Sequence, residues 1–197
     1  MFENVQRSPE TEELLNALKQ VPQRGFMFGH HDAPIYGIGW EGEQDRSDVK
    51  SVCGAYPAVM SFDLGGIELG SDQNLDKVSF DVIRKEVVKQ YQRGGMSTFS
   101  WHVYNPLTGK DSWDVSNANT VTSVLPGGAE YSKFQGYLDK VADFFKSIMT
   151  SDGVTVPILF RPWHEHTGNW FWWGKKNCTV QQLSLIHISE PTRLGMI

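Results

Sequence analysis

Residues 156–174 read Val156-Pro157-Ile158-Leu159-Phe160-Arg161-Pro162-Trp163-His164-Glu165-His166-Thr167-Gly168-Asn169-Trp170-Phe171-Trp172-Trp173-Gly174. The apolar run at residues 156–160 predicts a buried strand of a parallel sheet. Glu165 follows the carboxyl end of that strand, among two histidines, an arginine and four of the chain's seven tryptophans. A hydrophobic core does not need this mixture. A carboxyl group beside flat aromatic faces suits sugar chemistry, because the carboxyl transfers protons and indole rings stack on pyranose rings.

The rest of the chain alternates predicted strands with predicted helices. Apolar runs predict strands at residues 26–29, 58–62, 96–100 and 156–160. Capping residues followed by apolar residues at helical spacing predict helices that begin near residues 8, 45, 79 and 131, and the last of these is predicted to reach residue 150. Helices of about 15 residues between strands indicate a parallel α/β sheet.

Polar and aromatic residues gather directly after the predicted strands, among them His30, His31, Asp63, Trp101, His102, His164 and Glu165. Parallel α/β folds, and (β/α)₈ barrels especially, build their sites at these strand ends. The GxGxxG pattern at residues 37–42 does not directly follow the first strand, and no GxxxxGK[ST] motif occurs, which argues against the nucleotide-binding doubly wound folds. We expect a (β/α)₈ barrel represented by four strands, with a doubly wound sheet as the alternative.

Composition narrows the class of partner. The 197 residues, 40% hydrophobic and 21% charged, suffice for one domain with a core. The net charge of −5 argues against nucleic acid. No apolar run is long enough to span a membrane, and the polar N-terminus lacks the apolar core of a signal peptide. Cys53 and Cys178 form no CxxC pair, so a metal knuckle is not expected, although they would allow one disulfide.

Several long segments resemble one family of enzymes. Residues 161–174 closely resemble the acid/base segment of glycoside hydrolase family 26, the β-mannanases, and residues 100–106 resemble that family's third-strand segment. Shorter similarities bring the resemblance to residues 25–179. The resemblance implies a (β/α)₈ barrel, retaining hydrolysis of β-1,4-mannosidic bonds without a cofactor, and a secreted, periplasmic or cell-surface location.

The resemblance also implies roles for single residues. Glu165 matches the general acid/base. His102 and His164 match the histidines that line the subsite of the sugar to be cleaved, and Trp170 matches its aromatic platform. Arg161 matches a neighbouring polar support.

Trp113 matches a second stacking residue of the family. The family's nucleophile has no matching residue in this sequence. That nucleophile is a glutamate on the seventh strand, whereas only four strands are predicted here. We therefore expect the chain as written not to hydrolyse mannan.

Other interpretations of these residues stay open on sequence alone. Glu165 could be an exposed loop glutamate, and His102 and His164 could be core histidines bonded to backbone carbonyls. Packing explains Trp172 and Trp173 equally well. Two histidines flank Glu165, but the segment is not an HExxH motif on a helix, so we predict no metal site there.

Three alternatives to an endo-acting β-mannanase also stay open. The chain could come from a family 26 hydrolase of another β-glycan, from an exo-acting mannobiohydrolase, or from a module that binds mannan without cleaving it. A glutamate on the seventh strand of the longer protein would distinguish an enzyme from a binding module.

Residues 183–197 are predicted to differ in origin from the rest of the chain. Residues 183–193 resemble, residue for residue, the translation of an adapter end used in sequencing libraries. We therefore predict two parts, with residues 1–182 as the N-terminal half of a barrel domain and residues 183–197 as a non-native tail. A half barrel would leave its first and fourth strands with unpaired edges.

Overall fold

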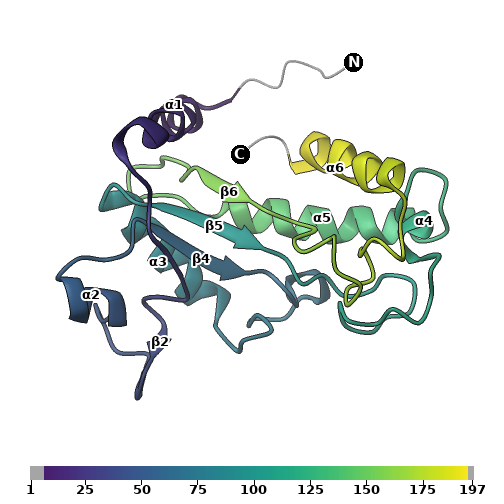
Figure 1. The fold of residues 1–197 in the computed structure, drawn as a ribbon, viewed down its shortest axis with the longest axis horizontal. Helices are drawn as coiled ribbons and strands as arrows, with labels where there is room; N and C mark the ends of the chain where they lie inside the picture. Colours follow the sequence, from purple (N-terminus) through teal and green to yellow (C-terminus); the bar gives the residue numbers. More distant parts are fainter. Residues whose placement is uncertain (1–6, 195–197) are drawn as a thin grey trace.

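A computed structural model describes residues 7–194, in which helices cover one face of a parallel sheet (Figure 1). The helices are α1 (Pro9–Arg24), α2 (Asp48–Cys53), η1 (Ile67–Leu69), α3 (Phe80–Gln92), α4 (Thr120–Val124), α5 (Tyr131–Lys146) and α6 (Val180–Leu194). The strands are β1 (Gly29–His31), β2 (Tyr36–Gly37), β3 (Trp40–Glu41), β4 (Val59–Asp63), β5 (Met96–Ser100) and β6 (Ile158–Phe160). No helix among the described residues is both long and apolar enough to cross a membrane.

The main sheet has the order β1-β4-β5-β6, with every pairing parallel, and β2 and β3 form a separate hairpin. The spatial order follows the chain order without a reversal. A doubly wound sheet reverses its strand order at a switch point, whereas a barrel proceeds in one direction around its axis. The observed order therefore agrees with the predicted barrel.

Most predicted elements form, with shifted ends. The strand predicted at residues 96–100 is β5 itself, and Ser8 and Ser79 cap α1 and α3 as predicted. The strand predicted at residues 26–29 is wrong in position. Gly29 is the residue that pairs with the start of β4, so Phe26 and Phe28 lie beyond that pairing and are 86% and 54% exposed.

Two predicted helices also differ at their ends. The helix predicted from residue 45 starts at Asp48, because the hydroxyl of Ser47 accepts from the Lys50 N–H and caps the helix there. The helix predicted to reach residue 150 ends at Lys146. Beyond it Met149 pairs with Thr155 in an isolated bridge, which already belongs to the turn toward β6.

An aromatic layer joins the sheet to α5. Phe62, Phe99 and Phe160 occupy one face of neighbouring strands, since parallel register partners point the same way. Phe99 packs edge-on against Phe144 and Phe145, with centroids 6.1 Å and 5.3 Å away. Each phenylalanine is preceded by a residue whose side chain points to the opposite face of the sheet, namely Ser61, Thr98 and Leu159. This face corresponds to the interior of a barrel.

The segment from residue 183 onward continues α6. Leu183 packs against the core, and Ile186 is buried where α6 crosses α4 and α5. Helical spacing of these two apolar residues explains why the segment forms an amphipathic helix. Its predicted adapter origin stays a prediction, and residues 195–197 lie outside the described residues. Cys53 and Cys178 are both free thiols.

We predict that Phe99→Ala lowers the free energy of unfolding by about 3–5 kcal/mol, because it leaves a cavity under α5. Urea denaturation measures this change. The control is Phe26→Ala, whose side chain is exposed, and which should change stability by less than about 0.5 kcal/mol. Equal losses for the two variants would contradict the packing described here.

Candidate active site

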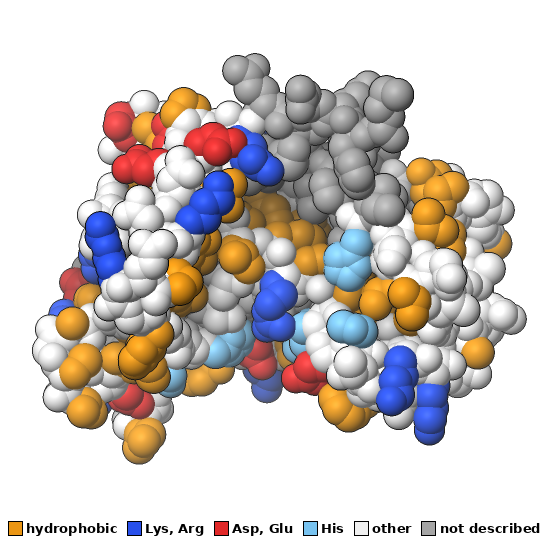
Figure 2. Space-filling view, turned by 45° about the horizontal axis from the view of Figure 1, so that its top comes forward, with side chains coloured by type: hydrophobic (Ala, Val, Ile, Leu, Met, Phe, Trp, Pro, Cys, Tyr) orange, Lys and Arg blue, Asp and Glu red, His pale blue; other side chains and the backbone are white. Residues whose placement is uncertain are grey.

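The carboxyl ends of β4, β5 and β6 bring the predicted site residues together. Asp63 ends β4, His102 follows β5, and His164 and Glu165 follow β6. A hollow crosses one face of the molecule, with histidine, acidic and basic side chains along it (Figure 2). The site residues that follow β4, β5 and β6 lie far apart in the sequence, and the parallel register of the strands brings them to one edge of the sheet.

Asp63 holds the imidazole of His102. Its Oδ2 lies 2.8 Å from His102 Nδ1 and 2.6 Å from Ser100 Oγ, and its Oδ1 accepts from the Gly65 N–H at 2.7 Å. Burial raises the pKa of Asp63, but the bonds from His102, Ser100 and Gly65 outweigh it and hold the pKa below its ordinary value. Asp63 is thus an ionised acceptor, and His102 donates to it through Nδ1.

His102 in turn orients the ring of His164 through a contact between their Nε2 atoms. The two Nε2 atoms lie 3.1 Å apart, and the rings meet edge to face. With one proton on the His102 ring, at Nδ1, its Nε2 is an acceptor, and His164 donates from Nε2. His164 Nδ1 is then a buried acceptor without a hydrogen-bond partner among residues 7–194. The Asp63–His102–His164 chain therefore fixes both rings in one tautomer.

His164 is held neutral. Burial, and then the neighbouring His102, lower its pKa to about 4 from 6.5. The interpretation of these histidines as isolated core residues bonded to backbone carbonyls therefore does not describe them, since each ring bonds to another side chain of the site. The neutral ring of His164 beside His102 can bind a sugar hydroxyl.

Glu165 is exposed at the mouth of the site, and Trp170 Nε1 donates to its Oε2 at 2.9 Å. Glu165 and Trp163 both have a left-handed backbone, with φ of 56° and 55°. Trp163, by contrast, is buried against Trp101 and Phe134.

Aromatic rings connect the predicted stacking residues. Trp113 stacks on His102 with centroids 5.1 Å apart, and Phe171 contacts Trp113, His102 and His164 at 5.2–5.5 Å. Trp113 and Trp170 are about half exposed, at 48% and 52%. Sequence reasoning did not identify Phe171, although its place between Trp170 and the buried tryptophans was a signal for a ring at the site boundary.

The remaining predicted residues lie at or below this surface. Arg161 is exposed, and its N–H donates to the carbonyl of Phe99, which continues the sheet by one residue. Trp172 and Trp173 are fully buried and donate to the carbonyls of Val103 and His164. They pack in the core, and Trp173 also fixes the backbone that carries His164.

Glu68 is a further residue that the sequence did not reveal. It is buried, with Oε1 accepting from the Tyr104 N–H and Oε2 from Trp101 Nε1 and the Gly66 N–H. Burial raises the pKa of Glu68 despite these bonds. Glu68 thereby clamps the residues on both sides of His102.

We predict that the stability contributed by a neutral His164 is lost on acidification. The unfolded histidine binds a proton below pH 6.5, but the folded one only near pH 4, so stability falls by roughly 2–3 kcal/mol between those values. Asp32, with a pKa raised to about 6 by burial, changes in the opposite direction over this range. The measurement is therefore the difference in unfolding free energy between the parent chain and His164→Gln at pH 7 and pH 4. A pH-independent difference would contradict the buried neutral state.

Comparisons with known proteins agree with this geometry. The family described as Glycosyl hydrolase family 26 matches residues 4–188. A mannan endo-1,4-beta-mannosidase of Bifidobacterium adolescentis is 32% identical over 186 residues, which are 91% of this chain and 18% of that protein. A mannan endo-1,4-beta-mannosidase of Bacillus subtilis is 28% identical, and the match covers 45% of it. The chain thus spans less than half the length of these relatives.

Solved structures show the same fold. A GH26 beta-mannanase from Bacteroides ovatus superposes with a TM-score of 0.93 at 56% identity, over 95% of this chain and 55% of that one. A modular endo-beta-1,4-mannanase from Cellulomonas fimi gives 0.84 at 32% identity, over 98% and 45%. These likenesses confirm the predicted fold, the first four β/α units of a (β/α)₈ barrel. With a family match across residues 4–188, the chain belongs to glycosyl hydrolase family 26.

Proposed function

We propose that this chain is the N-terminal half of the catalytic domain of a retaining endo-1,4-β-mannosidase, with Glu165 as the general acid/base. The observation that carries the proposal is the exposed Glu165 carboxylate, held by Trp170 Nε1 beside the His102–His164 pair. The relatives named mannan endo-1,4-beta-mannosidase support the substrate and the endo action.

Retaining hydrolysis needs a second carboxylate about 5–5.5 Å from the first. One carboxyl group protonates the leaving oxygen and later deprotonates water, while the other forms the covalent glycosyl-enzyme. Asp63 does not suit the second role, because it is buried and already accepts from His102, Ser100 and Gly65. We assign the nucleophile to a residue of the longer protein.

The exposed rings suit a polymer of neutral sugars. Trp113 and Trp170 are half exposed and both contact Phe171, so each has a ring surface free to stack on a pyranose. His102, His164 and Arg161 provide polar groups next to these rings. We propose β-mannan as the substrate, with sugar hydroxyls bound by these side chains.

We also propose that the protein acts outside the cytoplasm, as a secreted, periplasmic or cell-surface enzyme. A polysaccharide is too large to cross a membrane intact, so an endo-acting enzyme meets it outside the cell. This proposal rests on the substrate class.

For the whole protein, we predict that Glu165→Ala lowers kcat/KM on mannan by about 10²–10⁴-fold, because the leaving sugar needs a proton. An aryl mannoside with an acidic phenol as leaving group needs little protonation. Since kcat/KM reports the steps up to formation of the glycosyl-enzyme, its loss on this substrate should stay below about tenfold. Steady-state kinetics on both substrates measure the difference.

Glu165→Gln serves as the matched variant, because it keeps the size of the side chain and a carbonyl acceptor for Trp170 Nε1. It should show the same contrast between substrates as Glu165→Ala. Equal losses of kcat/KM on mannan and on the aryl mannoside would rule out the acid role.

For the chain of residues 1–197 alone, we predict no release of reducing sugar from mannan, because no described carboxylate is placed to form the glycosyl-enzyme. The measurement is a reducing-end assay of the purified chain beside its Glu165→Gln variant. Hydrolysis that persists in both would show that neither Glu165 nor a second half is needed.

A further inference from the structure

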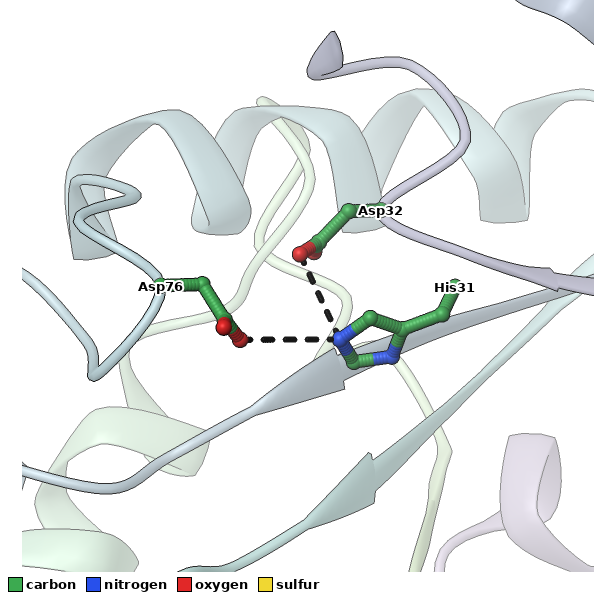
Figure 3. Close-up of side chains that lie close together, drawn as sticks. All are labelled: His31, Asp32 and Asp76. Carbon is green, nitrogen blue, oxygen red and sulfur yellow. Dashed lines mark ion pairs between the residues drawn. The ribbon is translucent and has the colours of Figure 1, made fainter. Parts of the chain in front are cut away.

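A second cluster of polar side chains lies at the end of β1, formed by His31, Asp32 and Asp76 (Figure 3). His31 is the last residue of β1, Asp32 follows it, and Asp76 comes from the loop between η1 and α3. In Figure 3 the imidazole and the two carboxyl groups point toward one another. His31 Nε2 lies 3.3 Å from Asp32 Oδ2 and 3.7 Å from Asp76 Oδ2.

These distances fit a shared metal ion. Zinc binds nitrogen and carboxylate oxygen at about 2.0–2.2 Å, so tetrahedral ligand atoms lie roughly 3.3–3.6 Å from one another. Each of the three residues offers one ligand atom, and all three atoms lie within 4.8 Å of one another. A small inward movement of the exposed Asp76 side chain would complete the set.

The surroundings of Asp32 give independent support for a cation site. The residue is fully buried, at 0% exposure, and its Oδ1 has no hydrogen-bond partner among residues 7–194. The known partners of its other oxygen are the hydroxyl of Tyr36 at 3.1 Å and the ring of His31. Asp76 is a like charge nearby. A buried carboxylate with a free oxygen beside a second carboxylate is costly unless a positive charge compensates it.

The ring of His31 is oriented for coordination. Its Nδ1 lies 3.1 Å from Ser61 Oγ, in the neighbouring strand β4. A proton on Nδ1 that is donated to this hydroxyl leaves the lone pair of Nε2 toward the two carboxylates. Metal-binding histidines in proteins are commonly oriented by such a bond on the other ring nitrogen.

We propose that His31, Asp32 and Asp76 bind one divalent transition-metal ion, and that this ion joins the end of β1 to the η1–α3 loop. One nitrogen and two oxygen ligands suit Zn²⁺ and similar ions better than Ca²⁺ or Mg²⁺. β1 and β6 are opposite edges of the four-stranded sheet, and Glu165 follows β6, so the ion lies at the other edge from Glu165. Its role is therefore structural, since it joins two segments of the chain.

The test is Zn²⁺ titration of the chain of residues 1–197 by isothermal calorimetry, after removal of metal with a chelator. The expected result is one Zn²⁺ per chain, with the dissociation constant raised at least tenfold in His31→Ala and in Asp76→Asn. The matched control is His30→Ala, an exposed histidine of the same strand that points to the other face, which should bind within twofold of the parent. These variants alter partly exposed side chains, so circular dichroism should show all of them folded.

Co²⁺ provides a second measurement, because its visible absorption reports nitrogen and oxygen ligands in a low-symmetry site. The spectrum should appear with the parent and His30→Ala and be lost with His31→Ala. Absence of Zn²⁺ binding by the folded parent would overturn the proposal. So would equal affinity of the parent, His31→Ala and Asp76→Asn, because the ion would then bind elsewhere.

Discussion

The parallel register between β4 and β5 is the constraint on which the site depends. It places Asp63 opposite Ser100, so that one carboxylate reaches the hydroxyl of Ser100 and the ring of His102. A slip of one residue would turn every side chain of β5 to the other face of the sheet. A slip of two would keep the face but move His102 by about 6.6 Å, beyond hydrogen-bond reach of Asp63. The aromatic layer against α5 enforces the register, because Phe62 and Phe99 must share one face.

Loops beyond the strands are held by buried polar groups rather than by further pairing. Glu68 binds the backbone of Gly66 and Tyr104 and the indole of Trp101, so the chain after β4 and the chain after β5 are joined at one carboxylate. Trp173 binds the carbonyl of His164 in a similar way beyond β6. The exposed groups of the site therefore stand on an inner layer in which Glu68 and Trp173 are hydrogen-bonded to the loops. Such a second layer is what keeps side chains within a few tenths of an ångström of a working position.

Local pattern predicted the strands and the order of the fold well where the apolar run coincides with the paired segment, as at β5. It failed at β1, because pairing depends on where the neighbouring strand begins and not on where apolar residues lie. The sequence did predict that His102, His164 and Glu165 lie together, since each follows a strand and all parallel strands end at one edge of the sheet. The link through Asp63, the clamp by Glu68 and the approach of Asp76 to His31 were not predicted, because each joins residues separated by more than thirty positions or by a loop without a pattern.

The left-handed backbone of Trp163 and Glu165 has a consequence for how this site can change over time. A non-glycine residue in that conformation costs of order 1–3 kcal/mol, and here two such residues flank His164. Glycine adopts the same conformation without that strain. A drift from Glu165 to glycine would thus remove the proposed acid and at the same time relieve the chain. Lineages freed from selection for hydrolysis would be expected to lose this glutamate first, while the exposed tryptophans proposed to bind sugar persist.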